Sequence, residues 1–158
     1  MAVTYEPIAT TTTASSASSV DFQSISSAYT DIVVIMNFSL SANNEVYLRF
    51  NNDSNNNYSR TYMEGNGSSA SSARQSTIAQ INILGRNSQM VNIINIMNYA
   101  NTTTYKTVVA RFSSPSEIVG AEVGLWRSTS AINRFTISLS AGTFTDGSVI
   151  SLYGIKAA

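Results

Sequence analysis

The chain has 158 residues, no cysteine and no histidine, and its nine basic and nine acidic residues give a formal charge of zero. This length suits one domain with a buried core and is too short for two ordinary domains. Without histidine and cysteine, the chain lacks the commonest general base, the commonest metal ligand and the thiol nucleophile, which argues against most hydrolases. Charged residues make up only 11% of the chain, and no cluster of Lys and Arg suits it to nucleic acid.

The first 19 residues are rich in Ser, Thr and Ala. They have neither the basic region nor the apolar region of a secretory signal, so we predict an N-terminal extended arm at residues 1–19 that becomes ordered on a neighbouring subunit. The longest apolar run, residues 32–36, is far shorter than the roughly 20 residues that a membrane-spanning helix needs. We therefore expect a soluble protein without a membrane partner and with a single domain at residues 20–158.

Apolar and polar residues alternate along most of the chain, which is the pattern of strands with one buried face. Val20 and Phe22 begin the first such strand. Residues 32–36 form a continuous, largely β-branched run, which is typical of a strand inside a sheet. The expected strands are residues 20–23, 30–40, 45–50, 58–63, 77–84, 90–97, 107–112, 119–127, 131–139 and 149–155.

Segments rich in Ser, Asn and Gly separate these strands, notably a turn at residues 41–44, a loop at residues 51–57 and a polar segment at residues 68–76. Short strands between such turns predict an all-β fold, an antiparallel β-sandwich that is jelly-roll-like. Residues 89–99 also fit a helical period. Their β-branched content favours a strand.

Catalysis by carboxylates is the chemistry that the composition leaves open. A glycosidase needs two carboxylates at a suitable separation, but none of the nine acids lies in a distinctive motif, and solvated acids are the simpler interpretation. The segment at residues 51–55 is rich in oxygen ligands but has one carboxylate, Asp53, and lacks the glycine and final glutamate of an EF-hand loop. We interpret it as an Asx-rich turn, and we predict no catalytic residue, no cofactor and no metal site.

Eight tyrosines and one tryptophan suggest a binding surface, because aromatic rings stack on sugars and Tyr hydroxyls add hydrogen bonds. Tyr47, Tyr58, Tyr62 and Trp126 are the candidates for contact with a partner or a glycan. The alternative is that these rings fill the core or a subunit interface, where Tyr and Trp are also enriched.

A series of short motifs runs through most of the chain and ends with the sequence LYGI at residues 152–155. The motifs are residues 8–12, 20–24, 29–34, 48–51, 57–59, 65–70, 124–129 and 151–155. In this order they resemble a family of small proteins of tailed bacteriophages, cyanophages among them. Its members are virion structural proteins, described as tail-fibre-like or as head decorations, and the resemblance implies no catalytic residue.

The resemblance implies a non-enzymatic protein that is made in the host cytoplasm and built into the virion. We expect a capsid decoration, or cement, protein on the outer surface of the phage head, present as a homo-oligomer, a trimer, and bound to the major capsid protein or another virion protein. Binding only to the assembled shell would stabilise the shell by mass action. The alternative is a tail-associated or tail-fibre adhesin module that binds host surface glycans.

Overall fold

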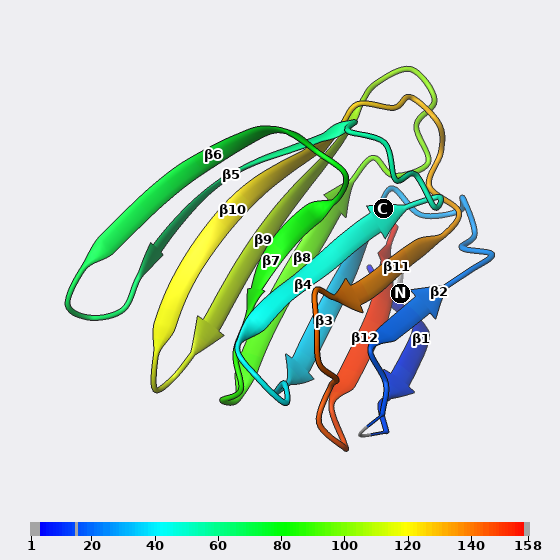
Figure 1. Ribbon diagram of the computed structural model, residues 1–158. Coiled ribbons are helices and arrows are strands. Elements are labelled where there is room, and N and C mark those ends of the chain that lie inside the picture. The colour runs from blue at the N-terminus through cyan, green and yellow to red at the C-terminus, as the bar shows by residue number, and fades with distance from the viewer. Residues whose placement is uncertain (1–3, 15, 157–158) are drawn as a thin grey trace.

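The structure, a computed structural model that describes residues 4–14 and 16–156, is a sandwich of an eight-stranded sheet and a four-stranded sheet (Figure 1). All pairings between its named strands are antiparallel. The all-β, antiparallel β-sandwich predicted from the sequence is therefore confirmed. Across the described part of the chain, no helix has the length and apolarity that crossing a bilayer requires.

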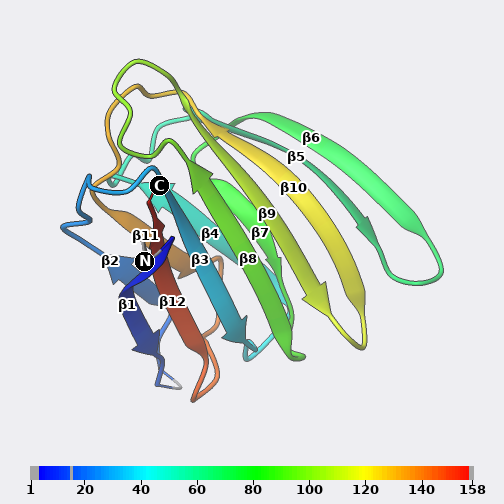
Figure 2. The same ribbon diagram turned by 180° about the vertical axis from the view of Figure 1, so that it is seen from behind.

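The large sheet has the strand order β1-β12-β3-β8-β9-β10-β5-β6. Its strands are β1 (Tyr5–Thr12), β12 (Val149–Ile155), β3 (Asp31–Phe38), β8 (Met90–Met97), β9 (Lys106–Ser114), β10 (Ile118–Trp126), β5 (Tyr58–Gly65) and β6 (Ala70–Ile78). Figure 2 shows this sheet in front, with β1 at one edge and the long, curved β5–β6 hairpin at the other.

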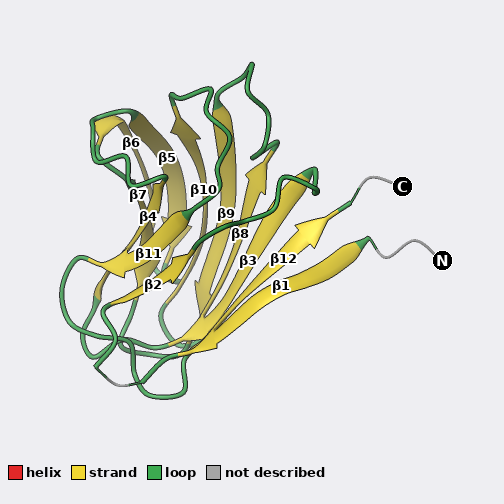
Figure 3. Ribbon diagram, turned by 90° about the vertical axis from the view of Figure 1, so that its right-hand side faces the viewer, coloured by secondary structure: helices red, strands yellow, loops and turns green. Residues whose placement is uncertain are grey.

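The small sheet has the strand order β2-β11-β4-β7. Its strands are β2 (Ser19–Phe22), β11 (Phe135–Leu139), β4 (Asn44–Phe50) and β7 (Ile81–Gly85). Figure 3 shows the two layers from the side, with the small sheet packed on one face of the large one. With half as many strands, the small sheet leaves the end of the β5–β6 hairpin projecting beyond it (Figures 1 and 2).

In most of the strands, every second residue fills the space between the sheets. In β3, the side chains of Ile32, Val34 and Met36 are fully buried in the same core cluster as Val46 and Leu48 of β4. Burying a side chain of this size stabilises the fold by about 1.5–3 kcal/mol relative to leaving it exposed. The alternation of apolar and polar residues in the sequence thus determines which side chains form the core.

The segment with two possible interpretations, residues 89–99, forms β8. Its Met90, Ile94 and Ile96 are buried, and the residues between them are more exposed, as a strand requires. Asn92 is buried in the same row, where its Nδ2 donates to the backbone oxygen of Leu84 at 3.1 Å. The strand prediction is confirmed, and the helical alternative is wrong.

Three expected elements differ from the structure. The predicted strand at residues 131–139 is shortened to β11, which begins at Phe135. The predicted strand at residues 77–84 is divided between the end of β6 and most of β7, because the chain passes from the large sheet to the small sheet there. The predicted loop at residues 68–76 is mostly β6. Its side chains are nearly all exposed, so no apolar alternation marks it, and its pairing with β5 makes it a strand.

The N-terminal segment also differs from the expected arm. Residues 5–12 form β1, which pairs with β12 of the same chain, and Thr13 N donates to Ser148 O at 2.8 Å. The described part of the segment therefore belongs to the sandwich itself. Residues 1–3 and 15 of the expected arm lie outside the described residues.

Close contact between the layers depends on one glycine. Gly124 of β10 lies against Ile81 of β7, and a Cβ added at this glycine would lie 2.6 Å from Ile81 Cδ1. A larger residue would push the small sheet away from β10.

Candidate functional site

One face of the large sheet points away from the small sheet, and we call it the outer face. The strand register aligns Ile35, Ile93, Arg111, Ala121 and Met63 in one row across β3, β8, β9, β10 and β5. Paired residues of neighbouring strands share a face, and the residues before and after each of these point into the sandwich. The outer face is thus defined by this row and by the residues at intervals of two along each strand.

The outer face carries most of the exposed large apolar side chains of the described residues. Among the described residues, nine large apolar side chains are exposed, and the register places eight of them on this face. The eight are Tyr5, Ile35, Met63, Val91, Met97, Val109, Val119 and Val123. The ninth, Tyr105, lies in the loop before β9. Apolar side chains exposed singly are ordinary, but eight on one face of one sheet indicate a contact surface.

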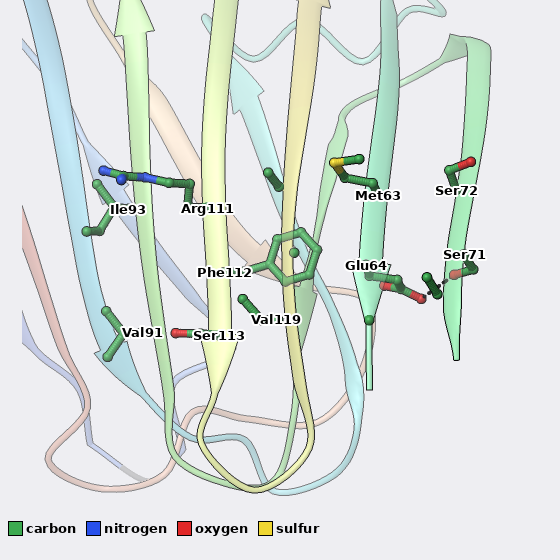
Figure 4. Close-up of a pocket in the computed structure, with 14 residues that line it drawn as sticks. Met63, Glu64, Ser71, Ser72, Val91, Ile93, Arg111, Phe112, Ser113 and Val119 are labelled. Carbon is green, nitrogen blue, oxygen red and sulfur yellow. Dashed lines mark hydrogen bonds between the residues drawn. The ribbon is translucent and has the colours of Figure 1, made fainter. Parts of the chain in front are cut away.

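A groove of about 770 Å³ crosses the outer face between β8 and β6. Figure 4 shows Val91 and Ile93 at one side of it, Met63 and Ser72 at the other, and Val119 between them. Arg111 and Glu64 are the charged residues among those that line the groove. The lining therefore suits an apolar partner surface, with one guanidinium in the groove, that of Arg111, available to pair with an acid or a carbonyl.

Two of the four aromatic candidates, Tyr58 and Trp126, lie in the core and not at the surface, with exposed fractions of 0% and 2%. Their rings stack at 6.2 Å between centroids, and Phe50 packs against both. The Tyr58 hydroxyl accepts from Phe50 N at 3.0 Å and donates to Asp53 O at 3.1 Å. This burial corrects the expectation that the two rings contact a partner or a glycan, because no ligand can stack on them in this fold.

The other two candidates, Tyr47 and Tyr62, are half-buried and lie on different sheets, in β4 and β5. Neither lines the groove on the outer face. The guanidinium carbon of Arg60 lies 4.7 Å from the centroid of the Tyr62 ring, so one face of that ring is already occupied. The four candidates therefore do not form one aromatic platform.

The Asn-rich loop at residues 51–57 is hydrogen-bonded to the aromatic core through Asp53. Its Oδ2 accepts from Trp126 Nε1 at 2.8 Å and from Asn57 Nδ2 at 2.9 Å, and its Oδ1 accepts from Asn55 N at 3.0 Å. Burial raises the pKa of Asp53, but these hydrogen bonds outweigh it and hold the pKa below its ordinary value. The loop is thus organised around one carboxylate that its neighbours already bind, as in an Asx-rich turn.

A buried charge cluster joins the β5–β6 hairpin to the rest of the molecule. Arg60 of β5 donates through Nε to Gln75 Oε1 of β6 at 2.7 Å and through Nη2 to Glu45 Oε1 of β4 at 3.1 Å. Its Nη1 donates to the backbone oxygen of Asn82 in β7. One side chain therefore connects four strands in two sheets.

Glu122 of β10 is the least satisfied member of this cluster. Its side chain is 1% exposed, Arg60 Nη1 lies 3.6 Å from Oε2, and neither carboxylate oxygen has a hydrogen-bond partner in the described structure. Burial raises the pKa of Glu122 to about 8, because desolvation outweighs the attraction of Arg60. The carboxyl is therefore largely neutral at pH 7, beside a cavity of about 90 Å³. Within residues 4–14 and 16–156, no group of three acidic residues is arranged to hold a metal ion.

Sequence reasoning missed both the outer face and the buried acid, although β10 carries a signal for each. The side chains of Val119, Ala121 and Val123 point to the face of the strand opposite to that of Trp126. Both faces of the strand therefore carry apolar residues. Glu122 shares the phase of Trp126 and hence its buried face. Reading the two phases of this strand separately would have found both features.

Comparisons with known proteins show no family. No family model and no curated protein matches the chain. Similar solved structures include the galectin LEC-6 of Caenorhabditis elegans, with a TM-score of 0.35 and 7% identity over 94% of this chain and 96% of that chain. Another is the marine PL-14 alginate lyase from Aplysia kurodai, with a TM-score of 0.30 and 11% identity over 85% of this chain and 72% of that chain. At these TM-scores, neither similarity bears on function.

Proposed function

We propose that the protein is a non-enzymatic structural subunit of a bacteriophage particle, and that the outer face of its large sheet binds a neighbouring protein of that particle. The observation that carries this proposal is the gathering of eight exposed large apolar side chains on one face of one sheet. Apolar surface left in water costs about 25 cal/mol for each Å², so a face of this kind gains stability when another protein covers it.

The charge distribution supports a protein partner for this face. The chain has a net charge of zero. Arg111 stands at the centre of the aligned row and is the one charged residue in that row. An apolar centre with few charges is the composition of a protein interface core, whereas a nucleic acid partner requires clustered Lys and Arg.

The proposed location of the protein in the particle rests on the sequence resemblance. It supports a capsid decoration protein on the outer surface of the head, with the major capsid protein as partner and with homo-oligomers of this chain on the shell. The outer face then supplies the contact. Binding to the assembled shell alone would stabilise it against disassembly.

The adhesin alternative has less support. Tyr58 and Trp126 are in the core, and one face of the Tyr62 ring is occupied by Arg60. The groove on the outer face is lined mainly by aliphatic side chains and hydroxyls, not by exposed rings on which a sugar could stack.

Binding to phage heads that lack the protein tests the proposal. We expect the purified protein to co-sediment with such heads, and the double variant Val119→Ser/Val123→Ser to bind at least about tenfold more weakly. The two valines are 63% and 51% exposed, so their replacement leaves the fold intact. Tyr105→Ser is the matched control, because Tyr105 is 53% exposed but lies in the loop before β9 and does not line the groove, and we expect it to bind like the wild type.

Two results would overturn the proposal. One is wild-type protein that does not bind the heads and is absent from purified particles in a mass-spectrometric copy count. The other is binding that Tyr105→Ser weakens as much as the double valine variant does, because the outer face would then not be the contact surface.

A further inference from the structure

The large sheet has two open edges, and the β1 edge is protected more fully than the β6 edge. At the β1 edge, Pro7 has no N–H to donate, and the register with β12 shifts between Pro7 and Ala9. Proline and bulges are two of the means by which natural edge strands avoid pairing with another chain.

The β6 edge has no proline, and its one register shift lies near the end of the strand, between Gln75 and Ile78. Its sequence, ASSARQSTI, contains no proline and one charge, Arg74, and its register with β5 is regular from Ala70 to Gln75. The first eight of its nine residues are exposed, on both faces of the sheet. From Ala70 to Gln75, β6 is thus a regular strand with mostly small side chains, and its free edge presents backbone N–H and C=O groups to solvent.

The other edges of the molecule are shorter. The small sheet ends in β2, with four residues, and in β7, with five. The β5–β6 hairpin also projects beyond the small sheet, so no other part of the sandwich lies in front of its free edge (Figures 1 and 2). Of the described edges, β6 offers another strand the longest regular stretch, from Ala70 to Gln75.

We propose that β6 pairs antiparallel with β6 of a second copy of this chain, so that the two large sheets become one continuous sheet. The pairing satisfies the free backbone groups of both strands at once, because a two-fold axis presents the same edge on each copy. The inference rests on the proposed function only in that both require the chain to act as a homo-oligomer. A two-fold contact gives a dimer, where the phage resemblance implies a trimer.

The charge on β6 selects the register. A pairing centred on Arg74 places the two arginines directly opposite each other, which is unfavourable. A pairing centred on Ala73 places Arg74 opposite the partner subunit's Ser72 and leaves no like charges opposite. A centre on Gln75 also avoids opposed arginines, but it would include the register shift between Gln75 and Ile78. We therefore assign the centre to Ala73, the neighbour of Arg74 within the regular part of the strand.

This arrangement also joins the two outer faces. Ala70 and Ser72 line the groove and lie on β6 itself, and a two-fold axis perpendicular to the sheet keeps both outer faces on the same side. The two grooves would then flank the new β6–β6 pair and form one extended apolar surface.

Charge substitution at Ala73 tests the inference on the full chain in solution, without phage heads. Light scattering of the wild type should give the mass of two chains of 17.0 kDa each. In Ala73→Glu and in Ala73→Lys, equal charges meet at the centre of the pair, so each variant alone should dimerise at least about tenfold more weakly. An equimolar mixture of the two should restore the dimer, because opposite charges then meet.

The controls separate pairing from folding and from head binding. Thr10→Glu places a charge on the exposed part of the protected β1 edge and should leave the dimer unchanged. A wild-type monomer or trimer at millimolar concentration would overturn the inference, as would a mixture of the two charged variants that stays monomeric. A dimer that fails to bind heads would overturn the proposed function alone.

Discussion

The inner and outer faces of the large sheet carry similar apolar side chains, but only the inner face is covered. Ile94 of β8 points inward and is fully buried, whereas Val109 on the adjacent β9 points outward and is 39% exposed. Strands that are apolar on both faces are typical of sheets covered on both sides. Under the proposed function, the large sheet is the middle of three layers, of which the described chain supplies two.

Truncation on the two faces should have very different costs. We expect Ile94→Ala to lower the free energy of unfolding by about 2–5 kcal/mol, because it leaves a cavity between the sheets. Val109→Ala removes a partly exposed side chain and should cost less than about 1 kcal/mol in the isolated protein. Urea unfolding followed by the fluorescence of Trp126, the one tryptophan, measures both.

The comparison would fail if the two variants lost similar stability as monomers. If the outer face is covered in the particle, Val109→Ala should instead act on head binding. A variant at Ser68, which lies in the exposed loop between β5 and β6, serves as a control that should change neither quantity.

The buried acid on the inner face should make stability depend on pH. Because the pKa of Glu122 is about 8 in the folded chain and ordinarily 4.5, the folded state holds the proton more tightly than the unfolded state does. The free energy of unfolding should therefore fall as the pH rises from 4.5 through about 8, by an amount on the order of a few kcal/mol.

Glu122→Gln should remove this dependence and be more stable than the wild type above pH 8, since glutamine needs no proton to remain neutral. Urea unfolding at several pH values measures the effect. Glu64→Gln removes a half-exposed carboxylate nearby and should keep the wild-type pH profile. Identical profiles for Glu122→Gln and the wild type would contradict the assignment.

Adjacent positions of β10 offer the finest contrast between the faces. A Cβ added at Gly120 would collide with the ring of Phe112 and lie 2.6 Å from Met63 O, so Gly120→Ala should cost about 1–3 kcal/mol. Ala121 points to the outer face, so Ala121→Val should change stability by no more than about 0.5 kcal/mol. Thermal unfolding of the two variants measures the difference, and equal losses would show that the outer face is already closely packed.

The strands that could be predicted from the sequence are those with one buried face. The strands that were missed have no alternation of apolar and polar residues. Residues 45–50 alternate strictly and form β4, whereas β6 has no buried face and looks like a loop. β1 was hidden in a Ser/Thr-rich segment for the same reason, because an edge strand gains its place through backbone pairing and not through its side chains.

The candidate site was harder to predict than the fold. An aromatic residue type does not by itself show whether a ring lies in the core or on the surface. The contacts of Phe50 and Asp53 with Tyr58 and Trp126 show that these two rings belong to the core. The eight exposed apolar side chains of the outer face come from six strands, and no single segment reveals that they share a surface.

The sequence by itself determined the fold class, because a side-chain period of two is a local property that the order of residues carries completely. It also determined the neutral composition and the lack of imidazole and thiol groups. Only the tertiary structure decided which apolar phase of each strand was covered, which acid was buried and which edge stayed open. Those outcomes depend on pairing between segments far apart in the chain, as when β3 joins β8 and β12, and a local pattern holds no information about its distant partner.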